Sequence, residues 1–420
     1  MSHHTILIIG GGTAGITVAA QLKRKDKDLD IAIMEPSEKH FYQPAWTLVG
    51  AGTFNYEDTV RNEVDYIPKG VEWIKDKATH VIPKENKVVS VHSGDITYDY
   101  LVVAPGLVMA PELLPGLSEA MEKGVVCSNY TDPEFTWKKM KAFRGGNMVF
   151  TQPTTPIKCG GAPQKIMYLA EEYLRKNGLR DKSNVVFATP GSVIFGTKEF
   201  ARTLNQIIHE RDIIFKPFYA PVKIDADAKK IYFKYTKPGE NGCVITEDNK
   251  LNENILGEST IELPFDFLHL APPQTAPKFI QDSIISIQEG ANKGWVDVDE
   301  YTLQHKRFEN IFALGDVAAL PTAKTGAAIR KQAPVVVENL LALVQKSQMG
   351  TAKYEGYSSC PLVTGYGKML LAEFKYGNVR DSDPLISKFV DTTKEQYSMW
   401  LLKKYGLPFL YWNLMLKGRA

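Results

Sequence analysis

The stretch TILIIGGGTAGITVAAQLKRK, residues 5–25, joins a short apolar run to a glycine-rich turn and then to a helical pattern. Residues 6–9 are all isoleucine or leucine, as expected for a parallel strand that is buried on both faces. Gly10, Gly12 and Gly15 then complete the pattern G-x-G-x-x-G. This order of strand, glycine turn and helix predicts a dinucleotide-binding βαβ unit, and therefore an α/β fold.

Each glycine of this turn has a separate task in such a unit. Gly10 permits the tight turn, Gly12 lets the backbone approach a pyrophosphate, and Gly15 lets the helix pack against the strand. A second strand, DIAIMEP (30–36), ends at Glu35, where an acid would bind a ribose hydroxyl. The alternative is an ordinary strand–turn–helix with chance glycines, but the strand, the spacing and the acid together favour a site for FAD or NAD.

Two later segments fit the same kind of domain. DITYDYLVVAPG (95–106) predicts a strand that ends in a glycine turn, and LQHKRFENIFALGDVAALP (303–321) contains a buried strand that ends at Asp316. This layout resembles flavoproteins with two dinucleotide-binding domains. The resemblance implies that Asp316 binds the flavin ribityl chain, although a helix N-cap is an alternative role. It also implies flavin contacts at the start of the next helix, at Lys324, Thr325, Gly326 and Ala327.

Residues 111–265 keep a strand–helix–strand rhythm but contain no second G-x-G-x-x-G. A flavoenzyme that takes electrons from NADH usually carries a second fingerprint there, so its absence disfavours a nicotinamide donor. The strand NMVFTQP (147–153) is followed instead by TTPIKCGGAPQ (154–164). We therefore predict two tandem Rossmann-like domains, the second without a nicotinamide site.

Cys159 stands where that fingerprint would be. A helical pattern begins near Gln164, and Pro163 suits a first helical turn, so Cys159 is expected just before a helix N-terminus. Unpaired amides and the helix dipole at such a place favour the thiolate and lower a thiol pKa from ~8.5. The alternative is a buried, unreactive cysteine that packs as a small hydrophobic residue.

The chain has three other cysteines, Cys127, Cys243 and Cys360, and the four together are too few and scattered for a disulfide scaffold. None forms a C-x-x-C pair, so no metal site is expected. Pro361 favours an extended backbone at Cys360, and a disulfide to Cys159 requires suitable geometry. Cys243 lies in a predicted hairpin tip, whereas Cys127 follows an apolar run, where a core role and a redox role both stay open.

Six longer motifs indicate a family. They are SEKHFYQPAWTLVGAG (37–52), PIKCGGAPQKIMYLAE (156–171), GWVDVDEYTLQH (294–305), GDVAALPTAKT (315–325), YSSCPLVTGYGK (357–368) and PFLYWNLMLKG (408–418). Together they resemble the sulfide:quinone oxidoreductases, most closely the branch that includes the mitochondrial enzymes. The resemblance runs from about residue 4 to the C-terminus, and its motifs are more specific than a shared FAD fold.

This resemblance implies site residues. Cys159 and Cys360 would be the two redox cysteines, bridged beside the flavin. FAD contacts outside the three glycines would be Thr13, Ala14, Glu35, Gln43, Ala78, Asp316 and Lys324 to Ala327. One departure is Val317, where the mitochondrial enzymes have a cysteine outside the redox pair. Some bacterial members hold FAD through a cysteine in the region of Cys127, but the local sequence here matches theirs poorly.

The implied reaction follows thiol–disulfide exchange. Hydrosulfide attacks the disulfide, Cys360 takes the persulfide, and Cys159 leaves as the thiolate that faces the flavin. A helix N-terminus at Cys159 agrees, because a stabilised thiolate is the better leaving group. Electrons then pass through FAD to a membrane quinone, and the sulfane sulfur passes to a small acceptor such as glutathione, sulfite or another sulfide.

The end of the chain, EQYSMWLLKKYGLPFLYWNLMLKGRA (395–420), mixes aromatic and aliphatic residues with lysine and arginine. This composition suits amphipathic helices in a lipid headgroup region, and a terminal helix docked on the core is the alternative. The lipid-soluble acceptor favours the membrane. We predict FAD-binding segments at 1–110 and 266–335, the second domain at 111–265, and a C-terminal region at 336–420 with amphipathic quinone and membrane helices.

Charge and length limit the partners and the location. The chain has 50 Lys and Arg against 48 Asp and Glu, so its net charge of +2 gives no reason to expect a nucleic-acid partner. We expect no signal peptide and no membrane-spanning helix. The predicted location is the surface of a bacterial plasma membrane, or of the mitochondrial inner membrane if a transit peptide has been removed.

Three other functions stay open at this point. A type II NADH:quinone oxidoreductase would show flavin bleaching by NADH. The flavoprotein subunit of a flavocytochrome c sulfide dehydrogenase would be secreted and would bury a surface against a haem protein, and the basic aromatic tail argues against it. An FAD-binding oxidative sensor would use the two cysteines without turnover.

Overall fold

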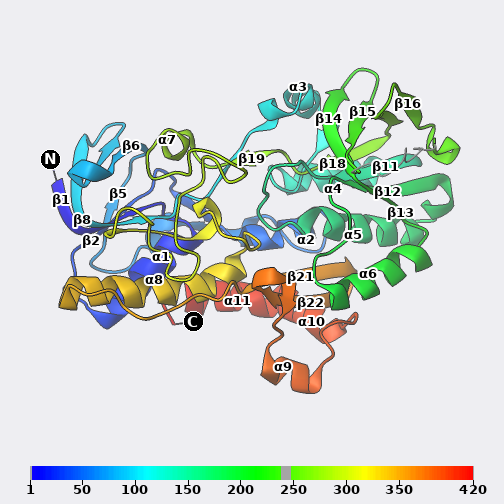
Figure 1. Cartoon of the computed structure of the whole chain (residues 1–420). Helices are drawn as coiled ribbons and strands as arrows, with labels where there is room; N and C mark the ends of the chain where they lie inside the picture. The colour runs from blue at the N-terminus through cyan, green and yellow to red at the C-terminus, as the bar shows by residue number, and fades with distance from the viewer. Residues whose placement is uncertain (1, 238–246, 420) are drawn as a thin grey trace.

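β1 (Ser2–Ile9) is the predicted apolar strand, and α1 (Thr13–Lys25) follows it after the glycine turn. The computed structural model that shows this describes residues 2–237 and 247–419. β1 pairs in parallel with β2 (Ile31–Met34) on one side and β8 (Asp95–Val103) on the other. The predicted α/β fold is confirmed, with two sheet-centred lobes side by side and a C-terminal layer along both (Figure 1).

The first lobe is built on a sheet that two distant parts of the sequence share. In spatial order its strands are β5 (Glu72–Ile74), β2, β1, β8, β7 (Lys87–Ser90) and β6 (Ala78–Ile82). β20 (Ile311–Ala313) pairs in parallel with the last residues of β8, so residues from beyond 300 return to this sheet. α8 (Gly326–Lys346) then packs beside α1 (Figure 1).

The second lobe has a parallel sheet with helices on it, as a Rossmann-like domain should. Its strands, in spatial order, are β10 (Val126–Cys127), β18 (Phe267–Leu270), β11 (Gly146–Thr151), β12 (Ser183–Thr189) and β13 (Ile214–Pro217). Its helices are α4 (Pro133–Ala142), α5 (Ala162–Lys176) and α6 (Lys198–Glu210). The sequence placed residues 266–335 with the first lobe, but β18 lies inside this sheet, because its buried residues pair with β10 and β11.

Shorter elements connect and cover the two lobes. An antiparallel sheet on the second lobe contains β14 (Tyr219–Asp225), β15 (Lys230–Tyr235), β17 (Thr260–Pro264) and β16 (Asn254–Leu256). Two small pairs are β3 (Lys39–Phe41) with β4 (Val60–Asn62), and β9 (Val108–Met109) with β19 (Gln274–Thr275). The short helices are α2 (Trp46–Val49), α3 (Leu117–Glu122) and α7 (Lys278–Gln281).

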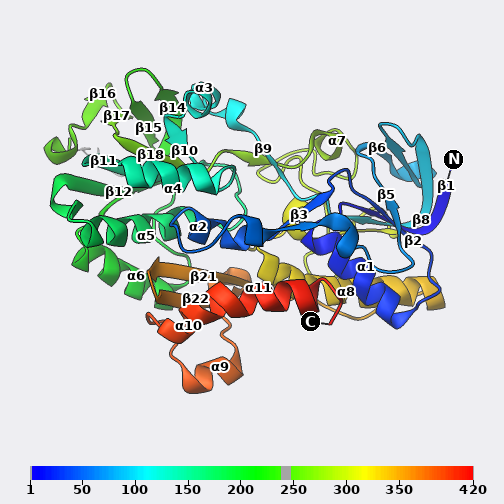
Figure 2. The same cartoon turned by 180° about the vertical axis from the view of Figure 1, so that it is seen from behind.

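The C-terminal layer combines a small sheet with a helical segment. The sheet contains β21 (Ser358–Gly365), β22 (Lys368–Lys375) and β23 (Val379–Arg380), and α9 (Pro384–Phe389) follows. The helical segment comprises α10 (Tyr397–Leu401), a π-helical turn (Leu402–Gly406), α11 (Leu407–Leu410) and a second π-helical turn (Tyr411–Met415). Figure 2 shows it running from β22 towards α1. Among the described residues, no helix has both the length and the apolar character to cross a bilayer.

Candidate active site

The glycine turn has the backbone geometry that a pyrophosphate site needs. Gly10 has a φ of +101°, and a Cβ there would lie 2.3 Å from the Ala104 carbonyl oxygen. A Cβ at Gly15 would lie 1.9 Å from the Gly10 carbonyl oxygen, so only glycine lets α1 approach β1. At Gly12 a Cβ would meet no described heavy atom within 4 Å. This open position beside a helix N-terminus fits the pyrophosphate of a dinucleotide.

Glu35 follows β2 and faces the same turn. Its Oε2 accepts a hydrogen bond from Gly11 N at 2.8 Å, and its Oε1 accepts one from Ser37 N at 2.8 Å. Burial raises the pKa of Glu35, and the two backbone donors oppose that rise. The carboxylate is therefore held beside the turn, within reach of a ribose. Thr13 and Ala14 begin α1 on the other side of the turn.

Asp316 lies in the connection between β20 and α8. Burial raises the pKa of its carboxyl, while the charges of Lys158 and Lys324 act to lower that pKa. Thr325 is the N-cap of α8, because its hydroxyl accepts a hydrogen bond from Ala328 N at 3.1 Å. Asp316 therefore does not cap this helix, and its carboxylate is available for a ligand.

Lys324 ties this connection together just before α8. Its Nζ donates to two backbone carbonyls of the connection, at 2.6 and 3.0 Å, and lies 4.1 Å from the centroid of the Trp295 ring. Burial lowers the pKa of Lys324 to about 8, although the charge of Asp316 opposes the shift. Gly326 and Ala327 form the first turn of α8, so the helix N-terminus is adjacent.

Gln43 and Ala78 occupy different surroundings. The Gln43 side-chain oxygen accepts a hydrogen bond from Lys158 Nζ, which links the FYQP motif to the residue before Cys159. Ala78 begins β6, and its methyl group is buried in an apolar cluster. A ligand would therefore reach Ala78 only through its backbone.

Cys159 and Cys360 come from distant parts of the sequence and lie in direct contact. The Cys360 thiol hydrogen-bonds to Cys159, and a Cβ at Gly161 would lie 2.4 Å from Cys360 Sγ. Both side chains are free thiols in this structure. Cys360 is part of β21, whereas Cys159 precedes the start of α5 at Ala162, as the sequence predicts. The structure thus brings together the loop before α5 and the strand β21, each of which contains one cysteine.

The backbone of Cys159 is held from both lobes. Its N–H donates to Lys324 O at 2.7 Å, and its carbonyl accepts from Ala162 N at 2.7 Å and from the Tyr130 hydroxyl at 3.1 Å. Since Lys324 leads into α8, the cysteine loop is fixed to the connection that carries Asp316. Cys159 also has a left-handed φ of +50°, a strained conformation that is common at functional sites.

The charges around the pair favour a thiolate on Cys159. The hydrogen bond from Cys360 holds the pKa of Cys159 well below its usual range against the effect of burial, and Lys165 Nζ, 3.1 Å from Sγ, lowers it further. The same contact raises the pKa of Cys360 well above its usual range. Lys165 projects from α5 and is only 2% exposed, so water screens its charge poorly.

A second buried lysine reaches the pair from the C-terminal layer. Lys403 lies in the first π-helical turn, is 3% exposed, and donates from Nζ to Pro44 O at 2.7 Å. Burial and the charge of Lys165 lower the pKa of Lys403 to about 7, whereas Cys159 and Cys360 act to raise it. π-Helical turns are rare and are frequent at functional sites.

A cavity of about 400 Å³ opens beside Cys360. Small residues form much of its wall, including Gly160, Gly161 and Gly196. The other lining residues are Phe195, Leu320, Pro321, Thr322, Ala323, Thr325, Phe374 and Asn378. A small polar molecule entering this cavity would meet Cys360 before Cys159, because Cys159 does not line it.

The remaining cysteines are outside this site. Cys127 lies in β10, is buried, and donates from Sγ to Leu268 O at 3.5 Å. Burial raises the pKa of its thiol to about 12, so it stays protonated and unreactive. Its core role is therefore the better interpretation. Cys243, in the predicted hairpin tip, lies outside the described residues.

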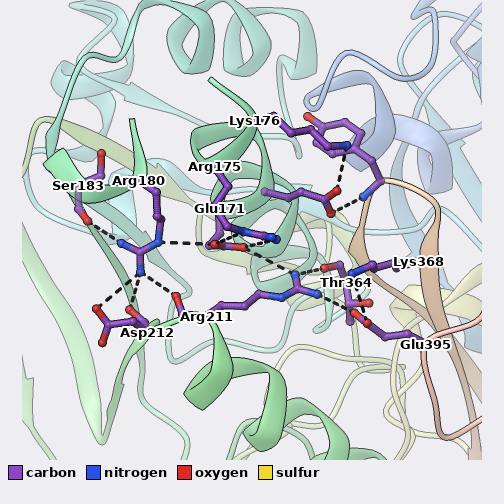
Figure 3. A network of polar contacts seen from close by, with 12 residues as sticks. Glu171, Arg175, Lys176, Arg180, Ser183, Arg211, Asp212, Thr364, Lys368 and Glu395 are labelled. Carbon is purple, nitrogen blue, oxygen red and sulfur yellow. Dashed lines mark hydrogen bonds and ion pairs between the residues drawn. The ribbon is translucent and has the colours of Figure 1, made fainter. Parts of the chain in front are cut away.

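An ionic network joins α5, which follows Cys159, to β21, which contains Cys360 (Figure 3). Glu171 of α5 is buried and pairs with Arg175 at 2.8 Å and with Arg211 at 3.8 Å. Arg211, just after α6, also donates to the Thr364 carbonyl of β21 and to Glu395 at 2.7 Å. Arg211 thus connects the helix after Cys159, the strand of Cys360 and the start of the C-terminal helical segment.

The helical segment has two different faces, and only one of them is exposed. Trp400, Tyr411 and Trp412 are buried, so these residues dock on the core. The exposed face carries Tyr397, Leu401, Tyr405, Phe409 and Leu410, and α9 adds Leu385 and Phe389 at 71% and 75% exposure. Residues at every fourth position of a helix share a face, so Tyr397, Leu401, Tyr405 and Phe409 form one apolar stripe along the segment.

Sequence reasoning identified the two cysteines but missed the lysines around them. Lys158, Lys165 and Lys403 all lie close to the pair, and each comes from a different local structure. A lysine on the otherwise apolar face of α5 was the available signal for Lys165. Lys403 gave no such signal, because another lysine follows it at position 404.

Comparisons with known proteins identify relatives of this chain. Residues 4–148 match the pyridine nucleotide-disulphide oxidoreductase family, whose members are flavoproteins. The mitochondrial sulfide:quinone oxidoreductase of Mus musculus is 41% identical over 99% of this chain and 87% of its own length. That of Dictyostelium discoideum is 42% identical over 99% of this chain and 86% of its own.

A solved structure shows the same fold. The X-ray structure of the sulfide:quinone oxidoreductase from Aquifex aeolicus superposes with a TM-score of 0.78 at 22% identity, covering 100% of this chain and 93% of that one. The fold matches that structure, and two relatives are identical at 41% and 42% of positions along nearly the whole sequence. This chain belongs to the sulfide:quinone oxidoreductase family.

Proposed function

We propose that this protein oxidises hydrogen sulfide and passes the electrons through bound FAD to a membrane quinone. The contact between Cys159 and Cys360, with Lys165 beside it, carries the proposal. The pKa of Cys159 is lowered and that of Cys360 is raised. When hydrosulfide opens a disulfide between them, Cys159 is therefore the better leaving group. The family membership supports the same activity.

The sulfur step begins with the two cysteines joined as a disulfide. Hydrosulfide attacks Cys360 Sγ, a new S–S bond forms as a persulfide on Cys360, and the bond to Cys159 breaks. Cys159 leaves with the electron pair as a thiolate, which Lys165 stabilises. An exchange in the opposite direction would expel Cys360, whose pKa is raised, and a more basic thiolate leaves more slowly.

The residues around the glycine turn fit FAD. The turn and the N-terminus of α1 would hold the pyrophosphate, Glu35 the adenosine ribose, and Asp316 the ribityl chain. Gln43, Ala78 and the segment Lys324 to Ala327 would line the remaining path. When bound, the flavin accepts two electrons from the sulfur pair and delivers them to a quinone.

The cavity beside Cys360 is the proposed entrance for sulfide and the site of the sulfur acceptor. A persulfide on Cys360 would face a space of about 400 Å³, which is within the usual range for small-molecule pockets. Transfer of the outer sulfur to glutathione, sulfite or another sulfide leaves a thiol on Cys360. The sulfur atoms of Cys360 and Cys159 can then form their disulfide again, and the two electrons released by this oxidation pass to the flavin.

The apolar stripe on the C-terminal helical segment is the proposed membrane surface. It includes Tyr405 and Phe409, each 61% exposed, and Lys404 directly precedes Tyr405 in the sequence. Aromatic rings with neighbouring lysines suit the lipid headgroup region. A protein held there would meet a lipid-soluble quinone, and the mitochondrial relatives favour the inner mitochondrial membrane as its location.

An anaerobic titration tests the proposal. Sulfide added to the purified holoenzyme should bleach the visible flavin absorbance before the first reading after manual mixing. A short-chain quinone should then restore the absorbance. NADH is the matched control and should leave the absorbance unchanged. Rapid bleaching by NADH would favour a type II NADH:quinone oxidoreductase instead, and bleaching by neither donor would sink the proposed activity.

A further inference from the structure

Tyr411, in the C-terminal helical segment, contacts Thr13 directly after the glycine turn. Its hydroxyl oxygen lies 2.7 Å from Thr13 Oγ1 and 2.6 Å from His40 Nε2. His40 Nδ1 lies in turn 3.0 Å from Glu63 Oε2. Tyr411, His40 and Glu63 are all buried, so water does not compete for these bonds. We call the chain of Glu63, His40, Tyr411 and Thr13 the tyrosine brace.

The tyrosine brace meets the glycine turn at both of its ends. Thr13 is the first residue of α1, immediately after the turn. At the other end, Glu63 Oε1 lies so near Gly11 that a Cβ at this position would be 2.4 Å from the oxygen. This oxygen is buried and has no hydrogen-bond partner among the described residues. The brace therefore spans the part of the turn that a pyrophosphate would occupy.

The direction of the protons in the brace follows from its chemistry. An ionised Glu63 only accepts, so His40 donates to it from Nδ1 and accepts from the Tyr411 hydroxyl at Nε2. The Tyr411 oxygen then accepts the Thr13 hydroxyl proton. The Thr13 hydroxyl proton is then committed to Tyr411, so the hydrogen-bond donors left to bind phosphate are the backbone amides of the turn.

The residues around Tyr411 hold it in place. The Tyr42 ring lies 4.7 Å from the Tyr411 ring, and the Tyr66 ring lies 4.9 Å from that of Trp412. Farther on, a Cβ at Gly418 would lie 2.7 Å from the backbone of α1 at Ala20. The end of the helical segment lies along α1, as Figure 2 also shows. Tyr411 cannot leave the turn unless this whole segment separates from α1.

We propose that Tyr411 is a positioning residue for the cofactor, and that docking of the C-terminal segment and retention of FAD are thermodynamically linked. The tyrosine brace holds the glycine turn in the conformation that receives the pyrophosphate, so binding does not have to order it. Linkage is reciprocal, so FAD must in turn hold the segment on α1. The proposal rests on FAD as the cofactor of the proposed function.

Tyr411→Phe tests the brace because it removes the hydroxyl and keeps the packed ring. FAD should leave the diluted holoenzyme about tenfold faster, as expected for the loss of two hydrogen bonds. The rate is read from the recovery of free flavin fluorescence, which does not depend on activity. Tyr405→Phe is the matched control, since Tyr405 is exposed on the same segment, and it should release FAD at the wild-type rate.

Two further measurements separate positioning from general stability. Thr13→Val should speed FAD release as Tyr411→Phe does, and the double variant should be no faster, because both changes break one brace. Excess FAD should slow tryptic cleavage at Lys417 in the wild type and much less in Tyr411→Phe. Equal release from Tyr411→Phe and Tyr405→Phe, or multiplying effects in the double variant, would overturn the inference. A purified protein without any flavin would instead contradict the proposed function.

Discussion

Cys159 and Cys360 have opposite pKa shifts, and each should be indispensable to sulfide oxidation for its own reason. Cys159→Ser removes the leaving thiolate, and Cys360→Ser removes the persulfide carrier, so each should lower turnover by more than ~1,000-fold. The double variant should be no worse, because the pair acts as one unit. Sulfide-dependent quinone reduction measures this, with flavin content as the check on folding.

Cys127→Ala is the control for this pair, because Cys127 is buried in β10 away from the site. It should keep most of the activity. Peptide mass spectrometry of the oxidised protein, after free thiols are blocked, should find a Cys159–Cys360 link. A link from Cys159 to Cys127 would show that the partner is misassigned.

Lys165 should control the titration of Cys159 in the reduced enzyme. The pKa of Cys159 is held low by Cys360 and by Lys165, so the wild-type thiolate should persist at pH values where an ordinary thiol is protonated. Lys165→Met removes one of these causes and raises that pKa, so the thiolate should be lost at a higher pH than in the wild type. Iodoacetamide alkylation against pH reads the change. Identical profiles for the two proteins would remove Lys165 from the site.

The buried ammonium group of Lys403 should destabilise the folded protein at neutral and acidic pH. Burial lowers its pKa to about 7 in the folded protein, whereas an unfolded lysine titrates near ~10.4. Between these values the unfolded state binds more protons, so stability rises with pH, and the penalty is complete below about pH 7. Lys403→Met should therefore raise the unfolding temperature at pH 7 by roughly a few degrees and lose that gain near pH 10.

At the scale of elements, Arg211 should hold α5 and β21 in their relative positions. Arg211→Met leaves the buried Glu171 with fewer partners and frees the Thr364 carbonyl, so unfolding should become easier by about 2–3 kcal/mol. Sulfide oxidation should fall as well, because the elements that carry the two cysteines lose their link. Urea unfolding followed by flavin fluorescence measures the first effect.

Lys368→Met is the control for that network, because Lys368 reaches Glu395 only at 3.7 Å and its side chain is 44% exposed. Its effect on unfolding should stay below about 0.5 kcal/mol. If Arg211→Met had an equally small effect, the network would be a surface feature without a role in placing the cysteines.

Some elements of the structure can be predicted from the sequence more fully than others. The strand, turn and helix of residues 2–25 follow from local apolar runs and glycine spacing, and Glu35 and Asp316 follow from their positions after strands. The place of Lys403 depends on packing across more than 200 residues, which no local pattern encodes. β18 is similar: four apolar residues predict a buried strand but not which sheet it joins.

At the scale of the whole molecule, the apolar stripe should govern attachment to membranes. Phe389→Asp combined with Phe409→Asp places one charge on the exposed side of α9 and one on the stripe, at rings that are 75% and 61% exposed. Each ring contributes at most about 2–3 kcal/mol when buried in lipid, so vesicle binding should fall by ~10-fold or more. Flotation with anionic vesicles measures it, and quinone reduction should decline together with binding.

Val91→Asp is the control for this surface, because Val91 is exposed in the first lobe, away from the stripe. It should float as the wild type does. Equal flotation of the double variant would assign membrane contact to another face. Point substitutions are preferable to deletion of the tail, since residues such as Tyr411 and Trp412 belong to the core.

The hydrogen bond between Thr13 and Tyr411 joins residues that are 398 positions apart, and this separation sets an order of events during synthesis. A ribosome makes the glycine turn 398 residues before the tyrosine that holds it. Domains generally begin to fold from the N-terminus as they emerge, so the first lobe must wait with an incomplete turn. Secure loading of the cofactor therefore comes only after translation has passed Tyr411.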